Sequence, residues 1–144
     1  MPVADGELEG NAAIIADFRA HEGQITLGRL AGANMLLMTS LGAKSGRSRT
    51  IPLGYSRDGE RYVVVGSNSG LPAQPAWLAN IAAHPVVTVE VGTETFQARA
   101  TISRDDERER LWRIHVSAIP FFATYEQMVE RQLQVVSLER LPPG

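Results

Sequence analysis

Residues 49–67 read RTIPLGYSRDGERYVVVGS, two β-prone runs on either side of Asp58-Gly59. Asp-Gly between two such runs is a strong hairpin signal, because both central residues of the tight turn can take a positive φ. Pro52 cannot donate a hydrogen bond to a neighbouring strand, so it indicates a strand edge, a strand start or a bulge. This stretch therefore predicts a fold built on antiparallel strands.

Further elements are predicted on both sides of this hairpin. Apolar residues at helical intervals predict a helix over 8–22, and a short apolar run predicts a buried strand over 34–41. Residues 86–103 predict a second hairpin with alternating faces. The remaining predicted elements are helices over 75–83, 106–118 and 122–131, and a last strand over 133–139. Roughly six strands in hairpins most often close into a small barrel or sandwich.

Composition narrows the class of protein. The 144 residues are 44% hydrophobic and 21% charged, which is ordinary for one globular domain. A net charge of -2 argues against a general nucleic-acid binder. The absence of cysteine excludes disulfides, thiol chemistry and thiolate-ligated metals. No apolar run is long enough for a membrane helix and the N-terminus has no signal pattern, so we expect a cytoplasmic protein.

The three histidines, at positions 21, 84 and 115, show no spacing typical of metal ligands. We therefore expect no metal site. His84 precedes a proline and His115 lies on a predicted helix, and we expect both to be surface or capping residues. Asp105 and Asp106 are the expected N-caps of that helix, and the charged run that follows them predicts a solvated face.

The segment LGAKSGRSRTIPL, residues 41–53, carries three cations and two serines, and it contains Lys44, the only lysine of the chain. It is not a Walker A loop, because Lys-Ser precedes Gly46 and a proline-interrupted strand follows. Its N–H groups, hydroxyls and cations suit a nest for an anion. A solvated basic turn has the same composition, so the residues alone leave both interpretations open.

Three motifs in order carry a resemblance to a known family. They are G-x-K-S-G-x-x-R-x-x-P-L (42–53), V-x-G-S-x-x-G (64–70) and P-x-W-x-x-N (75–80). From about residue 34 to 140 the chain resembles the deazaflavin (coenzyme F420)-dependent nitroreductase family. The resemblance implies a mainly β fold with flanking helices, a six-stranded antiparallel split β-barrel over about 33–140, in a single domain of residues 1–144. It also implies a homodimer that binds coenzyme F420 in place of FMN or FAD.

The resemblance further implies a coenzyme site made of a phosphate-side loop, a strand along the coenzyme, a backbone edge and a covering helix. The residues that match these parts are Lys44, Ser45, Arg49, Thr50, Ile51, Pro52, Leu53, Val65, Gly66, Ser67, Asn68, Ala76, Trp77, Leu78 and Asn80. Ile119, Phe121 and Phe122 match a substrate pocket. Phe122 stands where the best-known members have a tyrosine, which leaves Tyr125 as the candidate catalytic proton donor.

The activity implied by the resemblance is hydride transfer from the reduced deazaflavin to a quinone, an enone or a nitro-aromatic compound. The partner would be a small hydrophobic electron acceptor, with peripheral membrane association through a quinone. Two alternatives stay open. One is a non-catalytic module that binds F420 or an apolar ligand such as a fatty acid, and the other is the same fold using FMN, FAD or haem.

Overall fold

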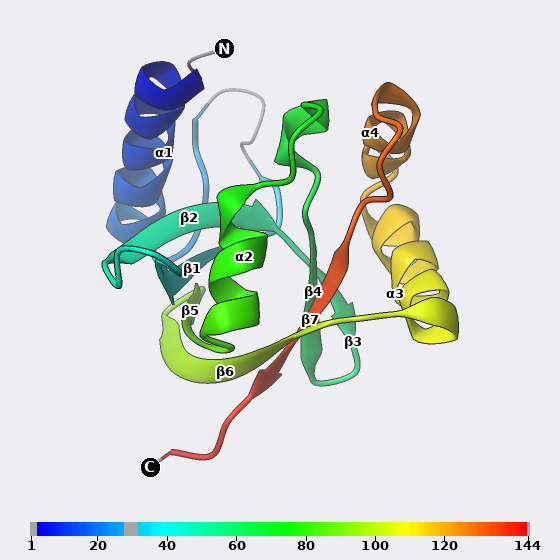
Figure 1. Ribbon diagram of the computed structural model, residues 1–144. Helices are drawn as coiled ribbons and strands as arrows, with labels where there is room; N and C mark the ends of the chain where they lie inside the picture. The colour runs from blue at the N-terminus through cyan, green and yellow to red at the C-terminus, as the bar shows by residue number, and fades with distance from the viewer. Residues whose placement is uncertain (1–2, 28–31, 144) are drawn as a thin grey trace.

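The computed structural model describes residues 3–27 and 32–143, so residues 28–31 of the segment before the first strand lie outside the described residues. Seven strands form one antiparallel sheet in the order β2-β1-β5-β6-β7-β4-β3, and the sheet curls into a half-barrel (Figure 1). The strands are β1 (Met35–Leu41), β2 (Ser48–Gly54), β3 (Ser56–Asp58), β4 (Arg61–Val65), β5 (Val86–Val91), β6 (Glu94–Ile102) and β7 (Val135–Arg140).

The predicted antiparallel split barrel is confirmed, but it has seven strands and not six. The extra strand arises because the run before Asp58 serves two partners. β2 pairs with β1 as far as Gly54, whereas β3 pairs with β4 from Ser56 onward. The chain therefore bends at Tyr55, whose N–H donates to the carbonyl of Asn34 (3.1 Å).

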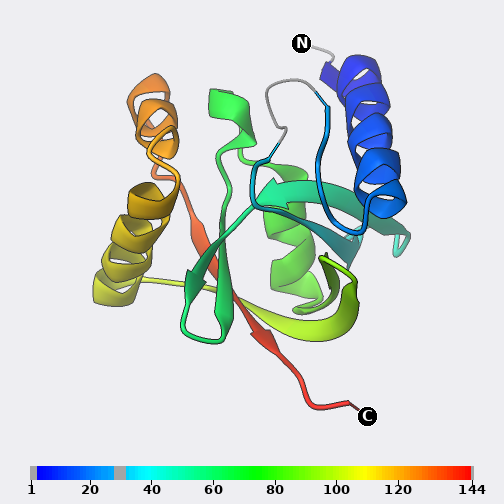
Figure 2. The same cartoon turned by 180° about the vertical axis from the view of Figure 1, so that it is seen from behind.

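Four α-helices flank the sheet: α1 (Val3–Ala20), α2 (Ala76–Ala83), α3 (Asp105–Ala118) and α4 (Phe122–Met128). The helix α1 lies on one flank, α3 and α4 lie on the other, and α2 lies between them, as the two opposite views show (Figures 1 and 2). Helix α1 begins earlier than the sequence predicts, and α4 ends three residues before the predicted position 131. Among the described residues no helix has both the length and the apolar character to cross a bilayer.

Strand alternation divides the core into layers. Leu36 and Met38 of β1 pack with Trp77 and Leu78 of α2, whereas Leu37 points to the opposite face and packs under α1. Burial of each of these large side chains contributes about 1.5–3 kcal/mol to folding. The helix α2 is thus fixed inside the curve of the sheet, beside the residues predicted to bind the coenzyme.

Two predictions for α3 are wrong. Its N-cap is Arg104, and Asp105 and Asp106 lie inside the first turn. Their negative charges stabilise the helix there by interacting with the positive end of its dipole. His115 is fully buried and not at the surface. The reason is its spacing of four residues from buried Leu111, which puts both on the face that packs against the sheet. The prediction that His84 is a surface or capping residue is confirmed, because exposed His84 is the C-cap of α2.

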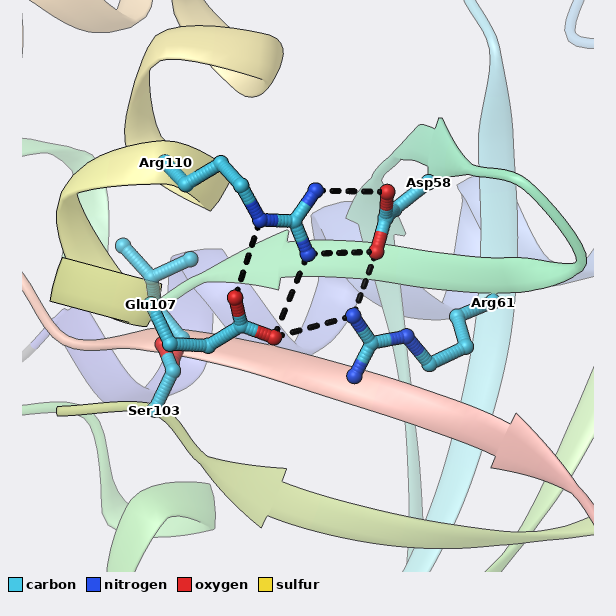
Figure 3. A network of polar contacts seen from close by, with 6 residues as sticks. Asp58, Arg61, Ser103, Glu107 and Arg110 are labelled. Atoms are coloured by element: carbon cyan, nitrogen blue, oxygen red, sulfur yellow. Dashed lines mark hydrogen bonds and ion pairs between the residues drawn. The ribbon is translucent and has the colours of Figure 1, made fainter.

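The charged face of α3 is tied to the hairpin between β3 and β4. Asp58 accepts hydrogen bonds from Arg61 and from both terminal nitrogens of Arg110 (2.9 Å each), and Glu107 accepts from the same two arginines (Figure 3). These two arginines hold the pKa of Asp58 well below its usual range. The predicted solvated face is therefore partly a structural network, and buried Arg108 does not belong to a solvated face at all.

Candidate active site

The cationic loop between β1 and β2 carries the first motif. Lys44, Arg47 and Arg49 are exposed, and none of them forms an ion pair with a described residue. By contrast, Arg19, Arg61, Arg108, Arg110 and Arg140 all pair with carboxylates. The three cations of residues 44–49 therefore have no counter-ion among the described residues, which leaves their charges available to an anionic ligand.

The backbone of this loop is already largely committed to internal bonds. Gly42 donates to the carbonyl of Arg47 (2.8 Å), Gly46 donates to the carbonyl of Gly42 (2.9 Å), and Arg47 donates to Ser45 Oγ (3.2 Å). Ala43 donates to Asn80 Oδ1 of α2 (2.9 Å). In the predicted anion nest, these four N–H groups are therefore already used, and the side chains of the loop are left to bind an anion. Asn80 anchors the loop to α2.

Strand β2 leads from this loop along an open edge of the sheet. β2 pairs only with β1, and the bond from Gly42 to the carbonyl of Arg47 sets the alternation of that ladder. The odd residues of β2 therefore face β1, and the backbone groups of Thr50 and Pro52 point outward. Pro52 lacks an N–H where no neighbouring strand needs one, as its predicted place on an edge requires. The side chains of Ile51 and Leu53 pack on the core beside α2.

A second open edge lies on β4, which is close to β2. β3 covers β4 only as far as Val63. Gly66 donates to the carbonyl of Gln134 beside β7 (2.9 Å), so alternation turns the N–H and C=O of Val65 away from β7. Val65 therefore offers one donor and one acceptor to the open side.

The turn after β4 is held from several directions. Asn68 has a positive φ of 48°, and its side-chain amide donates to the carbonyl of Ala73 (2.9 Å). Gly66 packs tightly on α2, since a Cβ at this position would lie 2.7 Å from Leu78. Trp77 and Leu78 are buried in the core, and Ala76 is exposed on the same helix. The second and third motifs therefore meet at Gly66.

Sequence reasoning missed Arg131, which lies outside this turn but holds it through hydrogen bonds. It follows α4 in the chain, and its guanidinium donates to Gly66, Ser67, Leu71 and Pro72 carbonyls and to Gln74 Oε1. No local pattern distinguishes it from other surface arginines, because its partners are 57 or more residues away in sequence.

The far end of β2 meets the predicted substrate pocket. A Cβ at Gly54 would lie 3.6 Å from Ile119 and 3.8 Å from Phe122. Tyr125 packs its ring edge against Phe121 and Phe122, at centroid distances of 5.0 and 5.3 Å. The structure thus brings Ile119, Phe122 and Tyr125 together at one end of β2, while Phe121 is 58% exposed.

His115 lies directly behind this aromatic group. Its ring is 4.4 Å from that of Phe122, its Nδ1 is hydrogen-bonded to Ser56 Oγ (2.8 Å), and Nε2 has no partner. Burial lowers the pKa of His115 from 6.5 to about 4, so the ring is neutral near pH 7.

The cationic loop therefore lies at the start of β2 and the aromatic group at its end. Between these two ends, β2 has an open edge, and β4 has another beyond Val63. A hollow of about 530 Å³ lies elsewhere, on the outer face of α3, and the described residues that line it include none of the predicted site residues. Within the described residues there is no group of three or more histidine and acidic side chains placed to hold a metal ion.

A comparison against known families identifies the family of the chain. The model of the F420H(2)-dependent quinone reductase family matches residues 13–140. The chain belongs to this family. Its members include an F420H(2)-dependent quinone reductase of Mycobacterium tuberculosis, to which the chain is 35% identical over 116 residues, or 78% of each protein.

Solved structures agree with the family and the fold. A structure described as an F420-H2 dependent reductase is 34% identical and superposes with a TM-score of 0.68, covering 74% of this chain and 94% of that one. A second structure, described as a domain-swapped dimer, is 31% identical with a TM-score of 0.69 and covers 96% of this chain and all of the other.

Proposed function

We propose that this protein is an oxidoreductase that uses coenzyme F420 to reduce quinones or similar activated acceptors. The observation that carries the proposal is the open edge of β2, with cations that have no ion-pair partner among the described residues at its start and an apolar aromatic group at its end. Family membership supports the coenzyme, and the relatives' names supply the quinone.

The backbone of the β4 edge fits the ring of a deazaflavin. Val65 offers an N–H and a C=O to the open side, and the next outward N–H belongs to Ser67. This donor, acceptor, donor order is complementary to the carbonyl, N–H, carbonyl edge of the pyrimidine ring of the coenzyme. Val65 and Ser67 would hold that edge, and the exposed cations would hold the acidic tail.

The length of β2 suits a ligand with well-separated ends. From Ser48 to Gly54 an extended strand spans about 20 Å. Lys44, Ser45 and Arg49 lie at its start and would bind the phosphate and glutamate groups of F420. FMN and FAD lack this polyanionic tail, so three free cations in this loop favour the deazaflavin.

The reduced coenzyme, when bound, supplies a hydride, and the chain supplies orientation and a proton. The side chains of Ile119, Phe121 and Phe122 would exclude water and stack on a flat acceptor beside the coenzyme. The phenol of Tyr125 is next to both phenylalanines and would donate the proton that the acceptor needs.

A titration of the purified protein with F420, FMN, FAD and haem, followed by fluorescence quenching, tests the coenzyme. We expect saturable binding of F420 at micromolar concentration and weaker binding of the other three. Mixing the reduced complex with a menadione-type quinone then tests turnover, and a Tyr125→Phe variant tests the proton donor. Tight binding without turnover would mean a coenzyme-binding module, and no F420 binding would overturn the proposal.

We also propose that the chain acts as a single-domain homodimer in the cytoplasm and meets lipid-dissolved quinones at the membrane surface. The domain-swapped relative supports a dimer. Phe121 and Met128, 58% and 57% exposed at the two ends of α4, support contact with an apolar surface. Light scattering would measure the mass, and co-sedimentation with vesicles would test the membrane contact.

A further inference from the structure

Arg131 gathers an entire loop around one guanidinium. Its Nη1 donates to the carbonyl of Gly66 (3.1 Å) and to Gln74 Oε1 (2.8 Å), and its Nη2 donates to the carbonyls of Ser67 (2.9 Å) and Leu71 (3.1 Å). Its Nε donates to the carbonyl of Pro72 (3.1 Å). One side chain thus orders every turn between the end of β4 and the start of α2.

The charge of Arg131 is not neutralised by the protein. All five acceptors are neutral, and no described carboxylate forms an ion pair with Arg131. Partial burial disfavours this unpaired cation and lowers the pKa of Arg131. A purely structural clamp would gain from a carboxylate partner, so the retained positive charge calls for another explanation.

The geometry of the peptide bond supplies that explanation. A peptide group is planar and trans, so its N–H points away from its C=O. The carbonyls of Gly66 and Ser67 point to Arg131, and the N–H groups of the same two peptides belong to Ser67 and Asn68. These two N–H groups therefore point away from Arg131, and that of Ser67 points to the open side of β4.

A cation on a carbonyl oxygen also withdraws electron density from the peptide. The N–H of that peptide becomes a stronger donor, because hydrogen bonds along a chain polarise one another. Arg131 acts on two successive peptides in this way. The result is a pair of strengthened donors backed by an unneutralised positive charge.

We propose that Arg131 is a positioning residue that aims and polarises the N–H groups of Ser67 and Asn68 toward the pyrimidine edge of the coenzyme. This inference rests on the proposed function. Because reduction increases the electron density on that edge, the donor pair favours the reduced coenzyme over the oxidised one.

The position of Arg131 also links the coenzyme turn to the substrate side. It follows α4, and α4 presses on the same turn at Gly70, where a Cβ would lie 2.7 Å from Met128 and 3.3 Å from Tyr125. The turn that would hold the ring is therefore packed between the arginine and the helix that carries the candidate proton donor.

The test compares Arg131→Gln with a matched control, Arg57→Gln. Arg57 is an exposed arginine that also donates to a backbone carbonyl, that of Gly59 (3.2 Å), at the opposite end of β4 from Gly66. Hydrogen exchange of residues 66–74 without coenzyme measures positioning, and dissociation constants for oxidised and reduced F420 measure polarisation. Fluorescence quenching gives the first constant, and anaerobic titration of reduced F420 gives the second.

We expect Arg131→Gln to speed exchange in residues 66–74 and to weaken binding of reduced F420 by about tenfold or more, the range for a lost charge-assisted bond. Oxidised F420 should lose less, so the ratio of the two constants changes, whereas Arg57→Gln leaves the ratio unchanged. Unaltered exchange or an unaltered ratio in Arg131→Gln overturns the inference.

Arg131→Lys guards against a variant that does not fold. It keeps the charge but cannot reach five acceptors, so we expect faster exchange in residues 66–74 with the ratio of constants retained. Wild-type exchange rates in Arg131→Lys would overturn the positioning role. If the wild-type protein binds no F420, the proposed function fails, and the exchange data still show whether Arg131 orders the loop.

Discussion

Acidification should destabilise this protein through His115. The ring is fully buried, and burial lowers its pKa from 6.5 to about 4. The folded protein therefore binds fewer protons than the unfolded chain in this range, and stability falls as the pH falls. The contribution is complete above pH 6.5 and is lost progressively down to pH 4, below which the folded state also takes up the proton.

The size of the effect follows from those two pKa values. The full difference corresponds to about 3 kcal/mol of unfolding free energy, and the part lost between pH 7.5 and pH 5 to about 2 kcal/mol. Asp17, Asp58 and Glu107 have lowered pKa values, so their contribution to stability is lost only when the pH falls below the ordinary pKa range of carboxyl groups. They therefore add little to the change in stability above pH 5.

Urea denaturation of wild type and His115→Gln at both pH values measures this contribution. Glutamine can still bond Ser56 but does not titrate, so the variant should lose about 2 kcal/mol less than wild type on acidification. His84→Gln, which alters an exposed histidine, is the matched control and should follow wild type. Equal losses in wild type and His115→Gln would refute the reasoning.

Three further predictions concern the coenzyme loop, the turn and the charged network. Lys44→Ala and Arg49→Ala should each weaken F420 binding by about 1–3 kcal/mol in a fluorescence titration. The control Arg113→Ala, which removes an exposed cation on α3, should leave F420 binding unchanged. Unchanged affinity in both loop variants would mean that the loop is only a solvated turn. Gly70→Ala should lower the unfolding free energy, measured by urea denaturation, by about 1 kcal/mol or more, because φ at this position is 77° and the new Cβ would meet Met128. Wild-type stability of this variant would contradict the close packing at Gly70. Asp58→Asn should lower it by about 1 kcal/mol at pH 7, less so in 1 M salt, and a loss independent of salt would argue against an electrostatic cause.

Local signals predicted most of the sheet. The turn at Asp58-Gly59 and the place of Pro52 on an edge depend on backbone chemistry that the residues carry with them. The break at Tyr55 was not predictable, because it depends on which strands lie beside Gly54 and Ser56. This break divides one predicted strand into β2 and β3, which is why the sheet has seven strands and not six.

Parts of the candidate site could be proposed from the sequence where a motif spans neighbouring residues, as in the cationic loop and the Ser67 turn. Long-range contacts were not predictable. The hydrogen-bond partner of His115 is Ser56, 59 residues away, and the partners of Arg131 are carbonyls of a loop from the other half of the chain. Four of the five acceptors of Arg131 are backbone carbonyls, which every residue type carries, so the sequence does not reveal these contacts.

Pro52 has a consequence for the life of the protein without its coenzyme. An exposed strand edge is normally a template for another strand and so a starting point for aggregation. On β2 the outward backbone position at 52 has a carbonyl but no N–H, so an incoming strand would lose a ladder bond in the middle of the edge. The edge of β2 is therefore open to a small ligand in the candidate site but resists pairing with a second polypeptide strand.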